Sequence, residues 1–184
     1  RIFNGEISGE VLGYTRTLKK RISANRWVYP FRMPKEVERV VFRLELSRED
    51  YGLFTDFAVE IRDGKGRALT KDGFGYDNMT VSFPNRKPGE TFFLTFTPGY
   101  ATKKPSPFTI EIREDYMTRE KIGIKVRGGT LYPYVPRELA FTLEKAPGPV
   151  PEGFQSLGRI LFKDAAEKQV RGYVPVRFQV HVDR

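Results

Sequence analysis

The chain has 184 residues, a net charge of +9, no cysteine and a single histidine. A chain of this length can bury a hydrophobic core without a disulfide or a metal ion. The absence of cysteine excludes zinc–thiolate sites, disulfide frameworks and thiol nucleophiles. No apolar run approaches the roughly 20 residues that a membrane helix needs.

The basic balance favours anionic partners, although charges that alternate in sign along the later segments fit an ordinary solvated surface equally well. Because the sequence begins with Arg1 rather than Met, we expect it to be a processed or excised part of a longer product.

The first quarter of the chain predicts two strands. Ile7 and Val11 mark a short strand interrupted by glycines, and a basic run follows at residues 19–21. Residues 27–31 form an aromatic cluster that contains Pro30. Because proline has no N–H to give to a central ladder, we expect this segment at the edge of a sheet.

The middle of the chain alternates apolar and polar residues, which is the period-two pattern of strands with one buried face. The inward-facing residues of the predicted strands lie within 40–46, 57–61, 79–83, 92–96 and 108–112. Asp63-Gly64-Lys65-Gly66 predicts a tight reversal after the second of these strands. We expect a polar turn at residues 48–52 and a glycine-containing loop at residues 71–78.

The β pattern continues after Met117, where alternation predicts strands at 122–126, 139–143, 158–162 and 174–182. A short helix opened by Pro136 is an alternative for the second of them. Residues 146–153 are the best linker candidate because they contain three prolines and two glycines. Residues 164–171 could form two helical turns with Asp164 as N-cap, or a polar loop.

Strands recurring at this spacing predict an all-β protein, an antiparallel β-sandwich of jelly-roll type with additional C-terminal strands. We expect a sandwich domain at residues 1–116. Residues 117–184 are expected to be a β-rich extension packed on the sandwich or completing it.

The block from Trp27 to Ile112 resembles a known family. Its order is VYPF, VVFRLEL, TDFAVEIRDGKGRAL and then GETFFLTF with FTIEI. This order is similar to that of the bacterial pre-peptidase C-terminal domain, a small jelly roll appended to secreted peptidases. The family's acidic residue, alternating apolar residues and Asp-Gly turn correspond here to Asp56, Phe57, Val59, Ile61, Asp63 and Gly64.

Two features depart from the family pattern. The acidic pair around its central strand is reduced here to Asp56, and residues after Ile112 have no counterpart in it. The resemblance implies a secreted, periplasmic or cell-surface protein whose β-module accompanies or assists a hydrolase.

The residues offer little for catalysis. His181 is placed by alternation on the polar face of the last predicted strand, and no GxSxG motif accompanies it. Asp56 and Glu60 share a strand face but are roughly 13 Å apart along it, whereas a glycosidase pair needs roughly 5–10 Å. We therefore expect no enzymatic activity, and expect the carboxylates to be matched by arginines such as Arg62, Arg43 and Arg113.

Two weak ligand sites can be named. Calcium prefers hard oxygen ligands from loops, and the turns supply Asp63, Asp72, Asp77 and Asn78, although these residues also simply favour turns. No cofactor other than calcium is expected. Aromatic rings near loops or sheet edges can stack on a ligand, and a nearby cation can hold its anionic group. The rings of this kind are Trp27, Tyr29, Tyr76 and Tyr100, and the cation is Arg32.

We thus predict a non-catalytic binding or accessory module of an exported prokaryotic protein, associated with a hydrolase or a surface assembly. Its expected partner is a protein or a glycan. The alternatives are a carbohydrate-active enzyme with paired carboxylates, and a basic binder of nucleic acid or anionic surfaces. Beyond the charge, no RNP motif, zinc finger or helix-turn-helix pattern supports nucleic acid.

Overall fold

The structure is a computed structural model, and it describes residues 5–102, 104–127, 131, 134–136, 138–164 and 170–178. The chain divides into two compact units. We call residues 16–117 the sandwich unit, and residues 1–15 with 118–184 the terminal unit. Two long strands, β1 (Gly5–Ile22) and β8 (Phe108–Arg127), contribute to both units.

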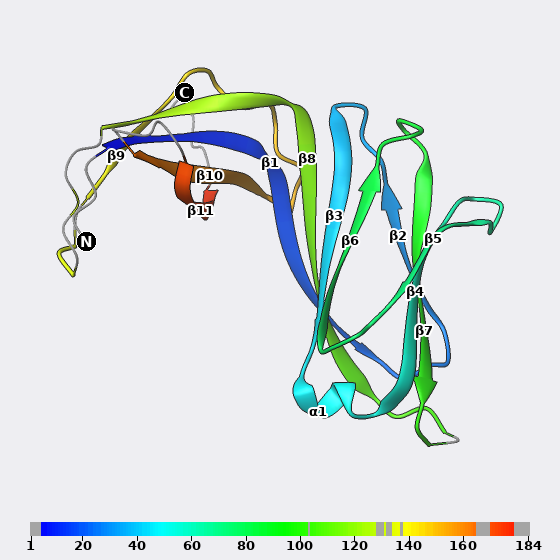
Figure 1. Cartoon of the computed structure of the whole chain (residues 1–184). Helices are drawn as coiled ribbons and strands as arrows, with labels where there is room; N and C mark the ends of the chain where they lie inside the picture. The colour runs from blue at the N-terminus through cyan, green and yellow to red at the C-terminus, as the bar shows by residue number, and fades with distance from the viewer. Residues whose placement is uncertain are drawn as a thin grey trace. The chain divides into compact units, whose positions relative to one another are not determined.

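The sandwich unit consists of two antiparallel sheets, which Figure 1 shows as two layers. One sheet has the order β1-β8-β3-β6 and the other the order β2-β7-β4-β5, which is the strand order of a jelly roll. The remaining strands of this unit are β2 (Trp27–Arg32), β3 (Val37–Leu46), β4 (Phe54–Arg62), β5 (Ala68–Gly73), β6 (Asn78–Pro84) and β7 (Thr91–Tyr100). The predicted antiparallel sandwich with additional C-terminal strands is confirmed.

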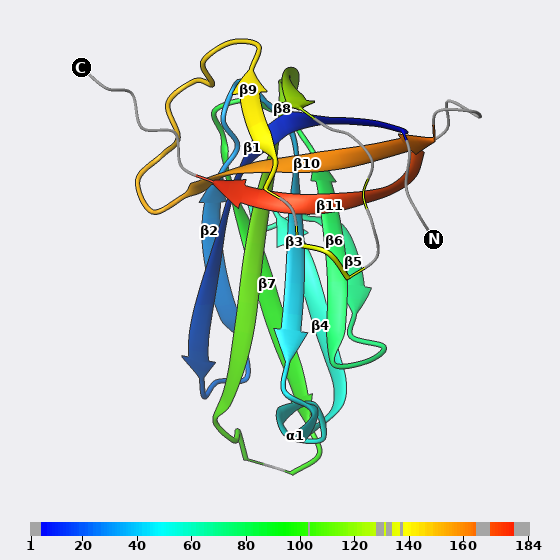
Figure 2. The same cartoon turned by 90° about the vertical axis from the view of Figure 1, so that its left-hand side faces the viewer.

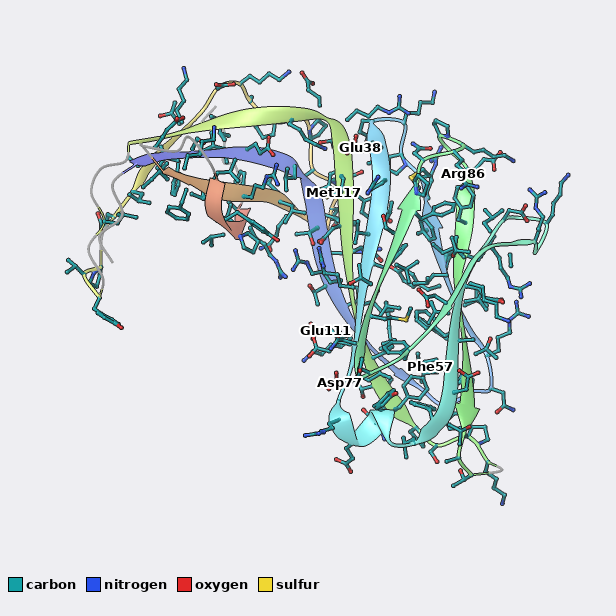
Figure 3. All side chains as sticks on the ribbon, viewed as in Figure 1. Glu38, Phe57, Asp77, Arg86, Glu111 and Met117 are labelled. Carbon is teal, nitrogen blue, oxygen red and sulfur yellow. The ribbon has the colours of Figure 1, made fainter. Side chains whose placement is uncertain are left out.

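The core of the sandwich unit follows the predicted alternation. In β3, Val40, Phe42, Leu44 and Leu46 are at most 3% exposed, while Arg43 and its neighbours of the same parity face outward. Phe57 points between the two layers, as Figure 3 shows, and is 1% exposed. Because successive side chains of a strand point to opposite faces, this pattern was readable from the sequence.

Turn chemistry shapes the ends of the strands. The predicted reversal after β4 closes with the N–H of Gly66 donating to the carbonyl of Asp63, and Gly66 has the left-handed φ of 79° that suits glycine. The expected edge position of Pro30 is confirmed, since β2 is the first strand of its sheet.

Two short elements differ from expectation. Residues 48–51 form a one-turn helix, α1 (Arg48–Tyr51), rather than only a turn, because the Ser47 side chain caps it by accepting the N–H of Asp50. Residues 71–73, expected in a loop, belong to β5 and pair with β4.

The terminal unit is a sheet of order β11-β10-β1-β8, with β9 paired to β8 (Figure 2). Its further strands are β9 (Ala140–Leu143), β10 (Gln155–Asp164) and β11 (Val170–Phe178). Residues directly opposite each other in a ladder share a face. The pairs Ile7 with Phe162 and Ile160 with Val174 therefore lie on one apolar face, whose buried cluster is Ile7, Val11, Ile122, Ile124 and Ile160.

Several predictions for the C-terminal part need correction. The helix at 164–171 is wrong at both ends, because Asp164 ends β10 and Val170 begins β11. Its remaining residues, 165–169, lie outside the described residues. Residues 146–153 connect β9 to β10 inside the terminal unit, so they do not link domains.

The expected strand at 139–143 is confirmed by β9, so its helical alternative is wrong. The final strand ends its described part at Phe178, and His181 lies beyond it.

The division into units differs from the expected domains at the N-terminus. Residues 16–117 form one unit, and residues 1–15 cluster with the C-terminal part. The physical reason is pairing, because β1 is hydrogen-bonded to β10 from Gly5 to Thr15. Sequence proximity therefore misassigned the first 15 residues.

Candidate binding site

The structure separates the five residues predicted to bind a ligand. Trp27 and Arg32 occupy opposite ends of β2. Arg32 pairs with Thr91 and Tyr100 pairs with Phe54, which places them at opposite ends of β7. No common binding surface forms from this set.

Three of the four rings in this set contact other parts of the sandwich unit. Tyr29 is 8% exposed, and the ring centroid of Trp27 lies 5.8 Å from that of Tyr29. The hydroxyl of Tyr100 donates to the carbonyl of Ala24 at 3.0 Å. Tyr76, in contrast, is 78% exposed.

The four residues proposed for calcium make local hydrogen bonds of their own. Asp72 Oδ1 accepts the N–H of Gly73, and Asp77 Oδ1 accepts the side-chain amide of Asn78. Among the described residues, no group of three Asp, Glu or His side chains is arranged to hold a metal ion. Calcium binding stays a prediction that this arrangement does not support.

The Asp63 side chain has a structural role in the turn after β4. Its Oδ1 accepts the N–H groups of Arg67 and Lys65 at 2.9 and 3.0 Å, and Oδ2 pairs with the Arg67 guanidinium at 3.2 Å. The N–H of Arg67 contributes most to holding the pKa of Asp63 below its usual value, and burial opposes this. The carboxylate therefore organises the hairpin rather than a ligand.

Among the described residues, the most deeply buried carboxylate belongs to Glu114 on β8, whose side chain is 0% exposed. Arg16 Nε donates to its Oε2 at 3.1 Å, and the hydroxyl of Tyr29 donates to its Oε1. Burial first, and then Glu114, raise the pKa of Tyr29 above its usual value. All three groups satisfy one another, as buried charges require.

Asp115 is the next residue along β8 and faces the other side of the sheet, as alternation demands. Its side chain is 3% exposed and accepts from Arg43 Nε at 3.2 Å and from Arg113 Nε at 2.9 Å. On β4, Glu60 is paired with Arg62. The expected match is therefore found for Glu60, while Arg43 and Arg113 pair with Asp115 instead, and Asp56 has no arginine partner among the described residues.

Sequence reasoning missed the Glu114 cluster, although a signal existed. Phe108, Ile110 and Ile112 face inward, and continuing the same parity places Glu114 among them. A carboxylate in the inward register predicts a buried, paired charge. Its partner Arg16 lies 98 residues away in sequence, so the pairing itself was unreadable.

An accessible site lies where two turns of the sandwich unit meet. The turn between β4 and β5 and the turn between β6 and β7 border an open hollow of about 400 Å³. Its lining is polar and charged: Asp63, Gly64, Lys65, Arg67, Lys87 and Glu90. This volume lies within the usual range for ligand pockets. We take this hollow as the candidate binding site.

The side chains of the hollow reach solvent. Arg67 is 72% exposed, Lys87 56% and Glu90 50%, whereas Asp63 is 9% exposed. Arg32 donates to the carbonyl of Gly89 at 3.2 Å, so it lies beside the lining residue Glu90. The hollow thus gathers one residue from each predicted site, Asp63 as lining and Arg32 as a neighbour, together with cations that no sequence motif marked.

No protein-family model and no curated protein matches this sequence. Among solved structures, the chain is similar to PliG of Aeromonas hydrophila, a periplasmic lysozyme inhibitor of g-type lysozyme. The match has a TM-score of 0.38 and 8% sequence identity, and it covers 56% of this chain and 86% of that chain. At that TM-score the likeness gives no information on what this chain binds or does.

Proposed function

We propose that this chain is a non-catalytic binding module of an exported prokaryotic protein, acting beside a hydrolase or in a surface assembly. One observation supports this most strongly. The buried carboxylates Glu114 and Asp115, where burial could tune acid–base chemistry, are held by arginines and point to opposite faces of β8.

Paired-carboxylate catalysis needs two acids that share one accessible cleft. Glu114 is closed to solvent, and its neighbour lies across the sheet. The accessible charged groups of the hollow sit instead on turns, which suits recognition of a partner. The sandwich supplies a rigid support for those turns. We expect the partner to be a protein, with a glycan as the second candidate.

Export and the association with a hydrolase derive from the resemblance to pre-peptidase C-terminal domains. No helix among the described residues is long and apolar enough to cross a bilayer. Fractionation of the native cell with an antibody against the sandwich unit tests the location. We expect the signal outside the cytoplasmic membrane, and a purely cytoplasmic signal would contradict export.

The binding role is tested by activity and by ligand-induced stabilisation. We expect the purified chain to hydrolyse no member of a panel of glycosides, peptides and esters. We expect its melting temperature to rise with a protein or glycan partner, because a ligand of the folded state alone stabilises it. Melts with calcium and with EDTA belong to the same panel. Turnover of any member of the panel by the parent chain would instead identify an enzyme.

A further inference from the structure

Three cations around the hollow lack a carboxylate partner among the described residues. Lys65 lines the hollow, Arg86 lies in the turn between β6 and β7, and Arg32 at the end of β2 donates to the carbonyl of Gly89. Figure 3 labels Arg86 in the segment between β6 and β7. The lining acids, in contrast, are matched, since Asp63 pairs with Arg67 and Glu90 pairs with Lys87. The local balance therefore favours an anionic group.

Gly64 adds a second, independent feature. A Cβ at this position would meet nothing within 4 Å, and its φ is not in the left-handed region, in contrast to Gly66. Neither sterics nor backbone conformation requires glycine here. Because Gly64 has no side chain, it leaves bare backbone at the wall of the hollow, and a ligand can approach this backbone closely.

One backbone N–H group of the same turn, that of Gly64, is available to a ligand. The N–H groups of Lys65 and Arg67 donate to Asp63 Oδ1, and that of Gly66 donates to the Asp63 carbonyl. The N–H of Gly64 has no acceptor in the part of the chain that the structure describes. A carboxylate oxygen placed against this turn would accept that N–H beside the Lys65 ammonium.

We propose that the hollow receives the carboxylate side chains of an acidic segment of a protein partner. A protein segment fits better than a sugar because no aromatic ring lines the hollow to stack on a pyranose face. A sulfated glycan is the competing ligand, and the binding test below distinguishes it from an acidic protein segment. This inference rests on the proposed function and specifies its partner.

Fluorescence anisotropy with a labelled glutamate-rich peptide tests the proposal, using the whole chain at low ionic strength. We expect binding that weakens steeply with added salt. Lys65→Glu/Lys87→Glu should weaken it about ten-fold, since reversing charges at a contact replaces attraction by repulsion. The matched control, Lys20→Glu/Lys104→Glu, changes two exposed lysines outside the hollow and should weaken it less than two-fold.

Gly64→Ala tests the backbone contact without changing charge. It should weaken peptide binding about three-fold or more, because its methyl group occupies the wall of the hollow. Gly75→Ala is the control, since its Cβ also meets nothing within 4 Å and Gly75 does not line the hollow. Both variants should melt within about 2 °C of the parent chain.

The outcomes separate cleanly. Equal losses in both charge-reversed variants would reduce the effect to net charge and overturn the proposal. If chondroitin sulfate binds in the hollow and the peptide does not, the site belongs to a glycan. This result would also overturn the proposal. Turnover of a substrate by the chain would contradict the proposed function but leave the peptide result unchanged.

Discussion

The two units bury their apolar residues in different ways. The largest side chains that are less than 2% exposed all belong to the sandwich unit, and half of them are phenylalanines. The buried cluster of the terminal unit consists of Ile and Val that are 4–8% exposed. On the same face, Val174 is 48% exposed and Phe141, paired with Val126, is 55% exposed. Two facing sheets exclude water from large rings, whereas the terminal unit buries smaller residues less completely.

The polar interactions of the two units differ in the same sense. In the sandwich unit, Glu114 is sealed with Arg16 and Tyr29. In the terminal unit, the pair of Arg159 with Glu10 has side chains 41% and 25% exposed. A buried pair costs much when one partner is lost, while an exposed pair contributes little. The depth of burial, rather than the number of contacts, should therefore decide the effect of each substitution.

The largest expected effect compares the two cores. Phe57→Ala should lower the free energy of unfolding by about 4 kcal/mol, because it removes a ring packed against Phe74 and Phe108. Ile160→Ala should cost about 2 kcal/mol, since its site is smaller and less sealed. Urea denaturation followed by tryptophan fluorescence and circular dichroism measures both. Equal losses would show that the two cores are equally well packed.

The next effect compares the charges. Glu114→Gln should cost about 3 kcal/mol, at the lower end for a broken buried pair, because the Arg16 side chain is 31% exposed and can reach water. Glu10→Gln in the terminal unit should cost less than about 1 kcal/mol. The same denaturation experiment reports both values. A small loss for Glu114→Gln would mean that the buried cluster tolerates a neutral partner.

The space around two glycines, one in each unit, also allows the units to be compared. In the terminal unit, a Cβ on Gly9 would lie 2.7 Å from the carbonyl oxygen of Arg159, so Gly9→Ala should cost about 2 kcal/mol through the strand shift it forces. In the sandwich unit, Gly64→Ala meets open space and should change stability by less than about 0.5 kcal/mol. Thermal melts rank the two. A neutral Gly9→Ala would show that β1 and β10 can separate slightly without loss.

The smallest effect concerns alkaline pH. Burial and Glu114 raise the pKa of Tyr29 in the folded chain above its ordinary value of 10.0. As pH rises, the unfolded chain loses this proton first, so the folded state binds more protons and the free energy of unfolding falls above about pH 10. Tyr29→Phe should therefore show a shallower decline than the parent chain. Urea melts between about pH 8 and pH 11 measure the two slopes.

Identical slopes in that experiment would mean that the pKa of Tyr29 is the same in the folded and the unfolded chain. Tyr134→Phe is the control for other tyrosines, since Tyr134 is fully exposed in the terminal unit.

Much of the sandwich unit was predictable from local pattern. Alternation around Phe42 and Phe57 fixed which residues face inward, and Pro30 placed β2 at a sheet edge. The Asp63–Gly66 reversal followed from turn chemistry. These features depend on residues within a few positions of one another, so a single sequence contains them.

The candidate site was predictable only in fragments. Asp63 and Arg32 were singled out for calcium and for ligand stacking, but the hollow forms because their turns meet beside Lys87 and Glu90. The meeting depends on β4 pairing with β7, with Arg62 opposite Phe93. No local periodicity encodes which strands become neighbours.

The sequence by itself therefore determined the β class, the inward faces and the tight reversal after β4, because period-two alternation and turn propensity act locally. Tertiary structure alone decided that residues 1–15 join the terminal unit, that Glu114 meets Arg16, and that two charged turns enclose a hollow. Each of these depends on pairing between strands far apart in the chain, and that pairing is selected by burial of the whole sheet rather than by any one segment.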